Sequence, residues 1–403
     1  MVGESITYPK GWKSSFIFLW LGSFITGLGY SMTMPFISLF MATLGRYSRL
    51  QLNLYSGLAF AMTFTSQALV SPYWGYLADR KGRKPMCLRA AGVMSLTIFI
   101  TGFAPNAAYI IVMRFIQGLF SGYINNAIAL IASETPHQRS GWVISQIMTA
   151  GTAGSLVGPL LGGALSNALG YRIPFFITGL LMFLVFLTTL FFVHEDFKPV
   201  AKEAMQPMGQ IMKSIPNTGL IIVMFVTTML VQASNMSIDP IVSLYVKDML
   251  GKNAANIAFI AGVVAAAPGL GTLLSASKVG HTMDRIGPGK VLIGGLVAGT
   301  IVFIPMALTH SPWVLAALRF ILGIASAGMI PAAQTILTLN VPAASFGRVF
   351  SYNQSFQAVG SVAGSLLGSA ISGLGSYPAV FLATGGMLVV NLLLVLIFNR
   401  KQN

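Results

Sequence analysis

The stretch Gly75-Tyr76-Leu77-Ala78-Asp79-Arg80-Lys81-Gly82 returns later in the chain as Gly280-His281-Thr282-Met283-Asp284-Arg285-Ile286-Gly287. The two copies are 205 residues apart, and the same spacing relates Met34-Pro35 to Asp239-Pro240 and Arg114-Phe115 to Arg319-Phe320. A fixed spacing of this kind indicates an internal duplication. Each half of the chain is therefore predicted to be one copy of a unit of about 200 residues.

The composition excludes an ordinary soluble domain. Hydrophobic residues make up 55% of the chain and charged residues 8%, against about 25% charged residues in soluble domains. Because a membrane-spanning helix needs about 20 apolar residues, the 403 residues have room for a dozen spans. We predict an all-α membrane protein with twelve transmembrane helices in two pseudo-symmetric six-helix bundles, near residues 15–44, 54–78, 86–104, 107–133, 141–168, 173–193, 217–249, 254–280, 290–309, 312–340, 346–373 and 377–398.

One polar segment interrupts the apolar pattern. Residues 194–216 carry charged side chains and three prolines, so this segment is too polar to span a membrane and too interrupted for a long helix. We expect an N-terminal bundle over residues 1–193, a cytoplasmic linker over 194–216 and a C-terminal bundle over 217–403. Duplicated bundles of this kind are the framework of many secondary transporters.

The formal net charge of +15 reports topology. An even number of spans places both termini on one side, and that side collects most of the basic residues, namely Lys10, Lys13, Arg80, Lys81, Arg83, Lys84, Arg89, Arg139, Lys198, Lys202, Lys213, Lys278, Arg285, Lys290, Arg348, Arg400 and Lys401. The other side has Arg46, Arg49, Arg172, Lys247 and Lys252. By the positive-inside rule both termini are expected in the cytoplasm, and no nucleic-acid partner is expected.

Cysteine and histidine usage offers no catalytic or metal site. Cys87 is the only cysteine, so the chain has no intramolecular disulfide and no cysteine-based metal pattern. The four histidines are scattered at the ends of the predicted spans, without a metal-ligand spacing. We expect neither a metal nor a cofactor, and the intramembrane residues lack the nucleophile and base of an enzyme.

The loop between the second and third predicted spans carries the pattern Gly75-x-x-x-Asp79-Arg80-x-Gly82-Arg83-Lys84. A glycine allows two helices to approach closely, and a carboxylate can pair with a cation one helical turn away. The pattern resembles the loop signature of the major facilitator superfamily, and the resemblance extends over essentially the whole chain. It implies a cytoplasmic latch of Gly75, Asp79, Arg80, Gly82, Arg83, Glu134, Asp284 and Arg285; the alternative is ordinary positive-inside loop charge.

Arg114 lies inside the fourth predicted span. Gln117, Ser121 and Asn125 follow it at i+3, i+7 and i+11, so a polar stripe is expected on one helix face. A cation at membrane depth normally faces a cavity or an acid, although this arginine could instead reach outward to the membrane interface. The segment resembles the fourth-span motif of the family, whose arginine is associated with proton coupling.

The fifth predicted span contains Gly154, Gly158, Pro159, Gly162 and Gly163. Small residues every four positions let another helix pack closely, and a proline permits a bend. A glycine and proline followed by paired glycines resembles the signature of family members that export substrate in exchange for protons. Plain helix packing is the alternative interpretation.

Asp239 is an acid within the seventh predicted span, and Gln232 and Asn235 share its helix face. Burial favours the neutral form of a carboxyl group, and water entry favours its release of a proton. Asp239 is therefore a candidate for proton coupling, together with Glu134 and Arg114. A solvated acid at the outer end of a helix remains the other interpretation.

Further polar and soft side chains are candidates to line a substrate cavity. The predicted lining consists of Tyr30, Met34, Gln117, Asn125, Asn126, Gln232, Asn235, Gln334, Asn353 and Gln357. The chain also has 21 methionines and 27 phenylalanines, residues that repack around dissimilar apolar ligands.

Together these features predict a secondary transporter that couples efflux of amphipathic drugs or toxic compounds to the proton gradient by alternating access. The expected partners are small amphipathic substrates, protons and membrane lipid, and the expected form is a monomer in a bacterial cell membrane. A dedicated transporter of a single metabolite and a lipid flippase of the same superfamily are the alternatives.

Overall fold

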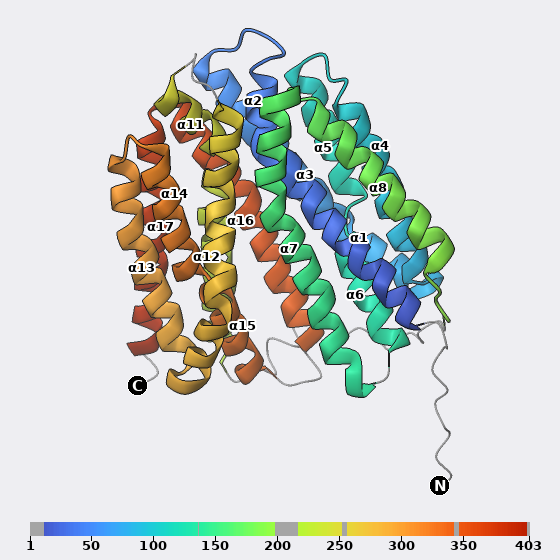
Figure 1. Cartoon of the computed structure of the whole chain (residues 1–403). Coiled ribbons are helices and arrows are strands. Elements are labelled where there is room, and N and C mark those ends of the chain that lie inside the picture. The colour runs from blue at the N-terminus through green and yellow to red at the C-terminus, as the bar shows by residue number, and fades with distance from the viewer. Residues whose placement is uncertain (1–11, 136, 198–216, 252–255, 342–345, 401–403) are drawn as a thin grey trace, which may run out of the picture.

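The computed structural model describes residues 12–135, 137–197, 217–251, 256–341 and 346–400, and these contain helices but no strand. Counting helices that continue one another end to end as one rod, the described helices form twelve rods (Figure 1). This confirms the predicted number of spans. The six rods of the N-terminal half are α1 (Trp12–Thr33) with η1 (Met34–Phe36) and α2 (Ile37–Met41), α3 (Arg49–Lys81), α4 (Arg83–Thr101), α5 (Ala107–Leu119) with α6 (Tyr123–Glu134), α7 (His137–Leu169) and α8 (Ile173–Phe192). Those of the C-terminal half are α10 (Thr218–Ile238) with α11 (Val242–Leu250), α12 (Ile257–Ile286), α13 (Pro288–Leu308), α14 (Pro312–Ser326) with α15 (Met329–Asn340), α16 (Phe346–Leu374) and α17 (Tyr377–Arg400).

Nine of the described rods are long and apolar enough to cross a membrane by length and composition. The other three are α3, α4 and α16, whose sequences contain more polar residues. α3 and α16 contact each other across the two halves, and polar residues of both helices are buried, among them Asn53 and Ser66 of α3 and Asn353 and Ser365 of α16.

Each half has its own hydrophobic core. In the N-terminal half the core includes Leu19, Ile110 and Met182, and in the C-terminal half it includes Leu292 and Phe381. Phe36 and Leu39 belong to the first half by sequence but pack into the second core. The segment of η1 and α2 is therefore a point at which the two halves are joined.

Four rods are interrupted: α1–η1–α2, α5–α6, α10–α11 and α14–α15. The breaks lie at residues 34–36, 120–122, 239–241 and 327–328, so the first and fourth rod of each half are interrupted. Gly122 has φ 112°, a conformation that favours glycine, and Pro35 and Pro240 stand at the breaks of the first and seventh rods. Interrupted helices are a common way to build an interior binding site in transporters.

The repeated loop motif forms the same tight turn in both halves. Gly82 ends α3 with φ 95°, and Gly287 ends α12 with φ 90°. α1 begins and α17 ends at the same end of the molecule as this turn between α3 and α4 (Figure 1). Lys13 in the first turn of α1, Lys81 in the last turn of α3 and Lys84 in the first turn of α4 belong to this end by their positions in the helices. We call this the basic end, and the other the far end.

The two halves meet at the far end. Ser372 donates a hydrogen bond to Asn53 at 3.0 Å, and the Asn167 amide donates to that of Asn256 at 2.8 Å. The Arg49 guanidinium lies over the ring of Tyr377, 4.5 Å from its centroid. In addition, the Ser243 hydroxyl donates to the carbonyl of Pro35. Through these contacts the described parts of the two halves are connected directly.

Toward the basic end the same helices separate. A Cβ atom placed on Gly75 of α3 would meet no atom within 4 Å, and the same holds for its repeat equivalent Gly280. The predicted close helix approach at Gly75 is therefore absent in this conformation, because the space beside its Cα atom is empty, although the adjacent Trp74 packs on Phe120. The molecule is closed at the far end and open at the basic end.

Candidate functional site

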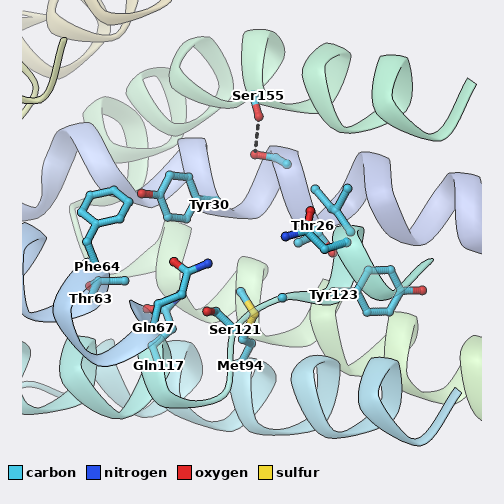
Figure 2. Close-up of a pocket in the computed structure, with 14 residues that line it drawn as sticks. Thr26, Tyr30, Thr63, Phe64, Gln67, Met94, Gln117, Ser121, Tyr123 and Ser155 are labelled. Carbon is cyan, nitrogen blue, oxygen red and sulfur yellow. Dashed lines mark hydrogen bonds between the residues drawn. The ribbon is translucent and has the colours of Figure 1, made fainter. Parts of the chain in front are cut away.

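A cavity of about 250 Å³ lies within the N-terminal half (Figure 2). Its wall comes from α1, α3, α4, the α5–α6 break and α7, and consists of Thr26, Gly27, Tyr30, Thr63, Phe64, Gln67, Met94, Gln117, Ser121, Gly122, Tyr123, Ile124, Asn125 and Ser155. Figure 2 shows Gln67, Gln117 and Ser121 together on one side of the space. The cavity combines aromatic and methionine side chains with uncharged hydrogen-bonding groups.

A second cavity of about 140 Å³ continues from the first toward the basic end. The two share Gln67, Ser121, Gly122 and Asn125. Its wall is more polar, and it adds Val70, Ser71, Trp74, Gly75, Arg83, Arg89, Gly118 and Asn126. The interior space thus reaches the turn between α3 and α4.

A third cavity of about 150 Å³ lies between the two halves. It shares Tyr30 and Ser155 with the first cavity, and it is bordered on the side of the C-terminal half by Met236, Asp239, Val242 and Ala265. The three cavities therefore form one row, from the basic end to the boundary between the halves.

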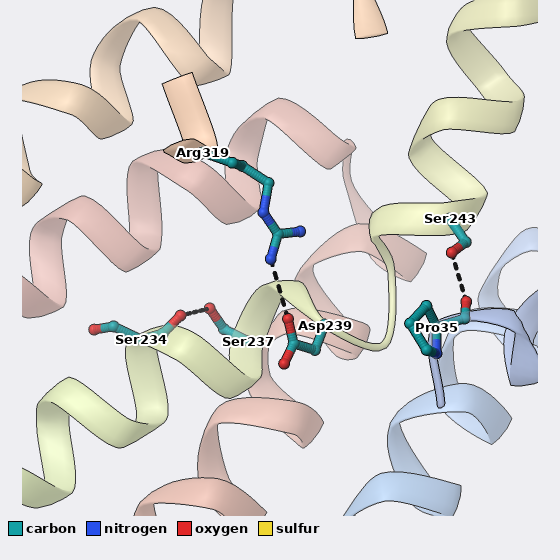
Figure 3. A network of polar contacts seen from close by, with 6 residues as sticks. All are labelled: Pro35, Ser234, Ser237, Asp239, Ser243 and Arg319. Atoms are coloured by element: carbon teal, nitrogen blue, oxygen red, sulfur yellow. Dashed lines mark hydrogen bonds and ion pairs between the residues drawn. The ribbon is translucent and has the colours of Figure 1, made fainter. Parts of the chain in front are cut away.

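Asp239 stands at the break between α10 and α11 (Figure 3). Its Oδ1 atom lies 3.2 Å from Nη2 of Arg319 on α14. The Arg319 side chain is 5% exposed and that of Asp239 is 38% exposed, so the carboxylate faces the cavity while the guanidinium is buried behind it. Because α11 continues the rod beyond Asp239, the acid lies deeper than a helix end.

Arg114 has a different partner. It is 2% exposed, which excludes the alternative that its side chain reaches the membrane interface. Its Nη1 donates to Oε1 of Gln117 at 2.8 Å, and no described carboxyl group lies within ion-pair distance of it. Arg114 does not itself line the cavities.

The predicted polar stripe lines the cavities, but on a broken helix. Gln117 is on α5, Ser121 is in the break and Asn125 is on α6. The sequence pattern does not predict this break. It exposes the carbonyl groups of Leu119 and Ser121, which accept hydrogen bonds from Trp74 and Arg89.

Five of the ten residues predicted to line a substrate cavity border the three cavities. Tyr30, Met34, Gln117, Asn125 and Asn126 line the three cavities. Five others, all from the C-terminal half, do not: Gln232, Asn235, Gln334, Asn353 and Gln357.

Two of these five residues, Asn353 and Gln232, lie in the contact between α10 and α16. Asn353 is fully buried there and accepts a hydrogen bond from Thr228 at 2.6 Å. Gln232 donates to Ser361 at 3.2 Å. Asn353 and Gln232 thus face a helix contact instead of the cavity.

Sequence reasoning missed the contribution of α3. Thr63, Phe64 and Gln67 line the first cavity, and Trp74 lines the second. The available signal was the lower apolarity of this span, in which Gln67 is an isolated amide. Polar positions in a less apolar span are more often interior than lipid-facing.

The predicted latch is only partly described. Glu134 is 5% exposed, and its Oε1 accepts from the backbone amide of Asp196 at 2.9 Å. The side chain of Asp79 lies outside the described residues. Asp284 and Arg285 of the second copy are exposed, and the Arg80 guanidinium lies over the Tyr76 ring at 4.5 Å.

An unpredicted acid occupies the loop turn. The Glu195 carboxylate accepts from the backbone amides of Arg83 at 2.6 Å and Lys84 at 2.7 Å. These are unpaired donors at the first turn of α4, where a negative charge is favourable. Glu195 therefore ties the end of the N-terminal bundle to the motif.

The glycine motif of α7 packs helices together. Cβ atoms on Gly154, Gly158 or Gly162 would collide with backbone atoms of α1, and one on Gly163 would press on Ala258 of α12. Close packing thus accounts for all four glycines. Gly360, Gly364 and Gly368 make the matching contacts between α16 and α10.

Twelve rods in two bundles, built from a duplicated sequence around a row of interior cavities, define a multi-pass membrane transporter. The chain belongs to the Major Facilitator Superfamily, whose family model matches residues 19–276 and 224–403. This confirms the family indicated by the loop motif.

Two similar relatives are the Multidrug resistance protein MdtG of Salmonella arizonae and that of Salmonella dublin. Each is 44% identical over 383 residues, which cover 95% of this chain and 95% of the relative. Among solved structures, the nucleoside transporter NupG is similar with a TM-score of 0.74 at 16% identity, covering 96% of this chain and 99% of NupG. A bacterial homolog of the human lysosomal transporter Spinster, in an inward-facing and unoccupied conformation, has a TM-score of 0.75 at 15% identity over 99% of this chain and 98% of its own. At this identity the structures show the shared fold.

Proposed function

We propose that this protein is a proton-coupled exporter of amphipathic drugs or toxic compounds that works by alternating access. The observation that carries the proposal is the Asp239–Arg319 ion pair at the boundary of the two halves, with the carboxylate facing the interior. The MdtG relatives, named as multidrug resistance proteins, support the same substrate class.

The orientation follows from charge. The basic end collects most of the loop cations, so we place it in the cytoplasm of a bacterial cell, with the far end outside. The open cavities then accept substrate from the cytoplasmic side. Rocking of the two halves would close this side and open the far end.

The ion pair supplies a coupling step. While Asp239 is ionised it balances the charge of Arg319, which is buried. When a proton binds Asp239 from the far side, the pair is lost and a buried cation is left without its partner, which is unfavourable. The conformation that gives Arg319 water or another partner is then favoured, so proton binding shifts the equilibrium between the two states.

The cavity wall matches amphipathic substrates. Tyr30, Phe64 and Met94 offer aromatic and polarisable surface, and Gln67 and Gln117 offer amide groups. Soft side chains repack around ligands of different shape. This combination favours several related amphiphiles over one polar metabolite.

The test is dye accumulation in everted membrane vesicles, driven by an imposed pH gradient, with and without an uncoupler. We expect the wild type to accumulate several unrelated amphipathic dyes that compete with one another. Asp239→Asn should bind dye but lose gradient-driven accumulation. Asp248→Asn, an acid on α11 outside the three cavities, is the matched control and should behave as wild type.

Two results would count against the proposal. Wild-type accumulation by Asp239→Asn would remove Asp239 from coupling. Saturable transport of one metabolite, without competition among dyes, would remove the multidrug assignment.

A further inference from the structure

We propose that Arg89 forms a subsite for an anionic oxygen group, such as a carboxylate, carried by the transported molecule. The inference rests on the proposed function, because it names a chemical feature of the exported compounds. It concerns the second cavity, which is lined by Arg89 from α4 and Trp74 from α3.

The Arg89 guanidinium is held in one position. It lies over the Trp74 ring, 3.8 Å from its centroid, and its Nη2 donates to the carbonyl of Ser121 at 3.0 Å. Trp74 is itself fixed, since its Nε1 donates to the carbonyl of Leu119 at 2.7 Å. A planar guanidinium fixed in this way loses little entropy when it binds a carboxylate.

The charge of Arg89 has no counter-charge in the described part of the chain. No described carboxyl group lies within ion-pair distance of it, and its Nε atom is buried without a hydrogen-bond partner. The walls of the first and second cavities contain no aspartate or glutamate. A ligand carboxylate would therefore meet a cation whose charge no described carboxylate balances.

Neutral donors surround the same space. These are Gln67, Ser71 and Asn125, which line the second cavity beside Arg89; Arg83, a second cation, also lines it. Hydrogen bonds from such groups to a carboxylate are stronger than those between neutral partners. Gln67 also borders the first cavity, as Figure 2 shows, so an anionic group beside Arg89 would have its apolar body next to Phe64 and Met94.

The internal repeat shows that the fold does not require this arrangement. The positions 205 residues after Arg89 and Trp74 are Gly294 and Val279, so the second half has neither the cation nor the ring. Arg172, in contrast to Arg89, is bonded to backbone carbonyls away from the cavities. Arg172 donates to the carbonyls of Gly102 at 2.9 Å and Ala104 at 3.2 Å and lies over the Phe40 ring at 5.5 Å, but it lines none of the three cavities.

The experiment compares two probes that differ in one charge: rhodamine B, which has a free carboxylate, and its ethyl ester, which does not. Binding is measured by fluorescence anisotropy to the full-length protein in nanodiscs of phosphatidylcholine. Arg89→Gln should weaken rhodamine B binding by about tenfold, the effect of losing a charge-assisted contact, and change ester binding by less than about threefold. Arg172→Gln is the control and should leave the ratio of the two affinities as in the wild type.

The same anionic chemistry could come from a lipid headgroup. Repeating the measurement with phosphatidylglycerol in the nanodisc separates the two sources. If lipid phosphate occupies the subsite, this lipid should abolish the preference of the wild type for rhodamine B over its ester. It should then have no effect on the affinities of Arg89→Gln. An affinity ratio in Arg89→Gln equal to that of the wild type, in both lipids, overturns the subsite. Failure of the proposed export function would give a different result from failure of the subsite. Vesicles with the wild-type protein would then accumulate neither probe, while the difference in rhodamine B binding between the wild type and Arg89→Gln persisted.

Discussion

Asp239 and Arg319 form an ion pair. The residues at the equivalent positions of the first half, Met34 and Arg114, form none, because methionine has no charge. Both arginines are buried, but Arg114 donates a hydrogen bond to Gln117 on its own helix, whereas the position equivalent to Gln117 in the second half is Leu322. The two halves thus solve the same problem of a buried cation in different ways. Only the solution in the second half contains a group that titrates near the cavity.

The two members of the ion pair should differ in their effect on stability. Asp239→Leu leaves the buried Arg319 without a counter-charge and is expected to cost about 3–5 kcal/mol. Arg319→Leu leaves an acid that is 38% exposed and can take up a proton, so it should cost less. The double variant should recover most of the loss. Thermal unfolding in detergent measures all three, and equal losses for the two single variants would contradict this.

Moving the acid to its repeat position should restore part of the coupling. Met34 and Asp239 line the same cavity, and Met34→Asp would introduce a carboxyl group in the half that contains Arg114. We expect Met34→Asp with Asp239→Asn to regain some gradient-driven dye accumulation in everted vesicles, relative to Asp239→Asn alone. Met34→Asn in the same background is the control, and equal activity of the two double variants would argue against the exchange.

Linking the halves at the far end should stop transport. The amides of Asn167 and Asn256 are in hydrogen-bond contact across the boundary, and Cys87 is the only native cysteine. In a Cys87→Ser background, Asn167→Cys with Asn256→Cys should be joined by a short bis-maleimide and lose dye accumulation, while dye binding persists. Each single cysteine variant treated in the same way should remain active. Full activity after complete cross-linking would show that the far end need not open.

Two glycines should respond to substitution in opposite ways. Gly154→Val would collide with the Phe24 carbonyl of α1 and is expected to destabilise the protein by about 1–3 kcal/mol. A Cβ atom at Gly75 would meet no neighbour within 4 Å, so the apparent melting temperature of Gly75→Val should match that of the wild type. If α3 packs closely when the basic end shuts, Gly75→Val should still reduce transport. Normal transport by a stable Gly75→Val would exclude that contact.

Much of the architecture could be predicted from the sequence, because bilayer thickness and the repeat limit the possibilities. Span positions agree with the rods to within several residues; for example, α3 begins at Arg49 instead of residue 54 because Ser48 and Gln51 form a capping box. The burial of Arg114 and the cavity position of Asp239 also follow from the high cost of isolated charge in an apolar interior.

The remaining features depend on partners distant in sequence. Asn353 is predicted to line the cavity because it is polar within a span. In the structure it instead accepts a hydrogen bond from Thr228 on another helix. The carboxylate of Glu195 finds its amide donors 111 and 112 residues away. The helix break at Gly122 requires only one residue of positive φ, which a pattern of apolar periodicity does not detect.

Part of the contact of α7 with α12 is made by main-chain atoms. Gly163 lies against the backbone of Ala258, and Gly262 lies against the carbonyl of Pro159. Surfaces without long side chains have no interlocking ridges and no rotamers to reorganise when they slide or tilt. At this place the two bundles could change their mutual angle as a smooth pivot, at little enthalpic or entropic cost.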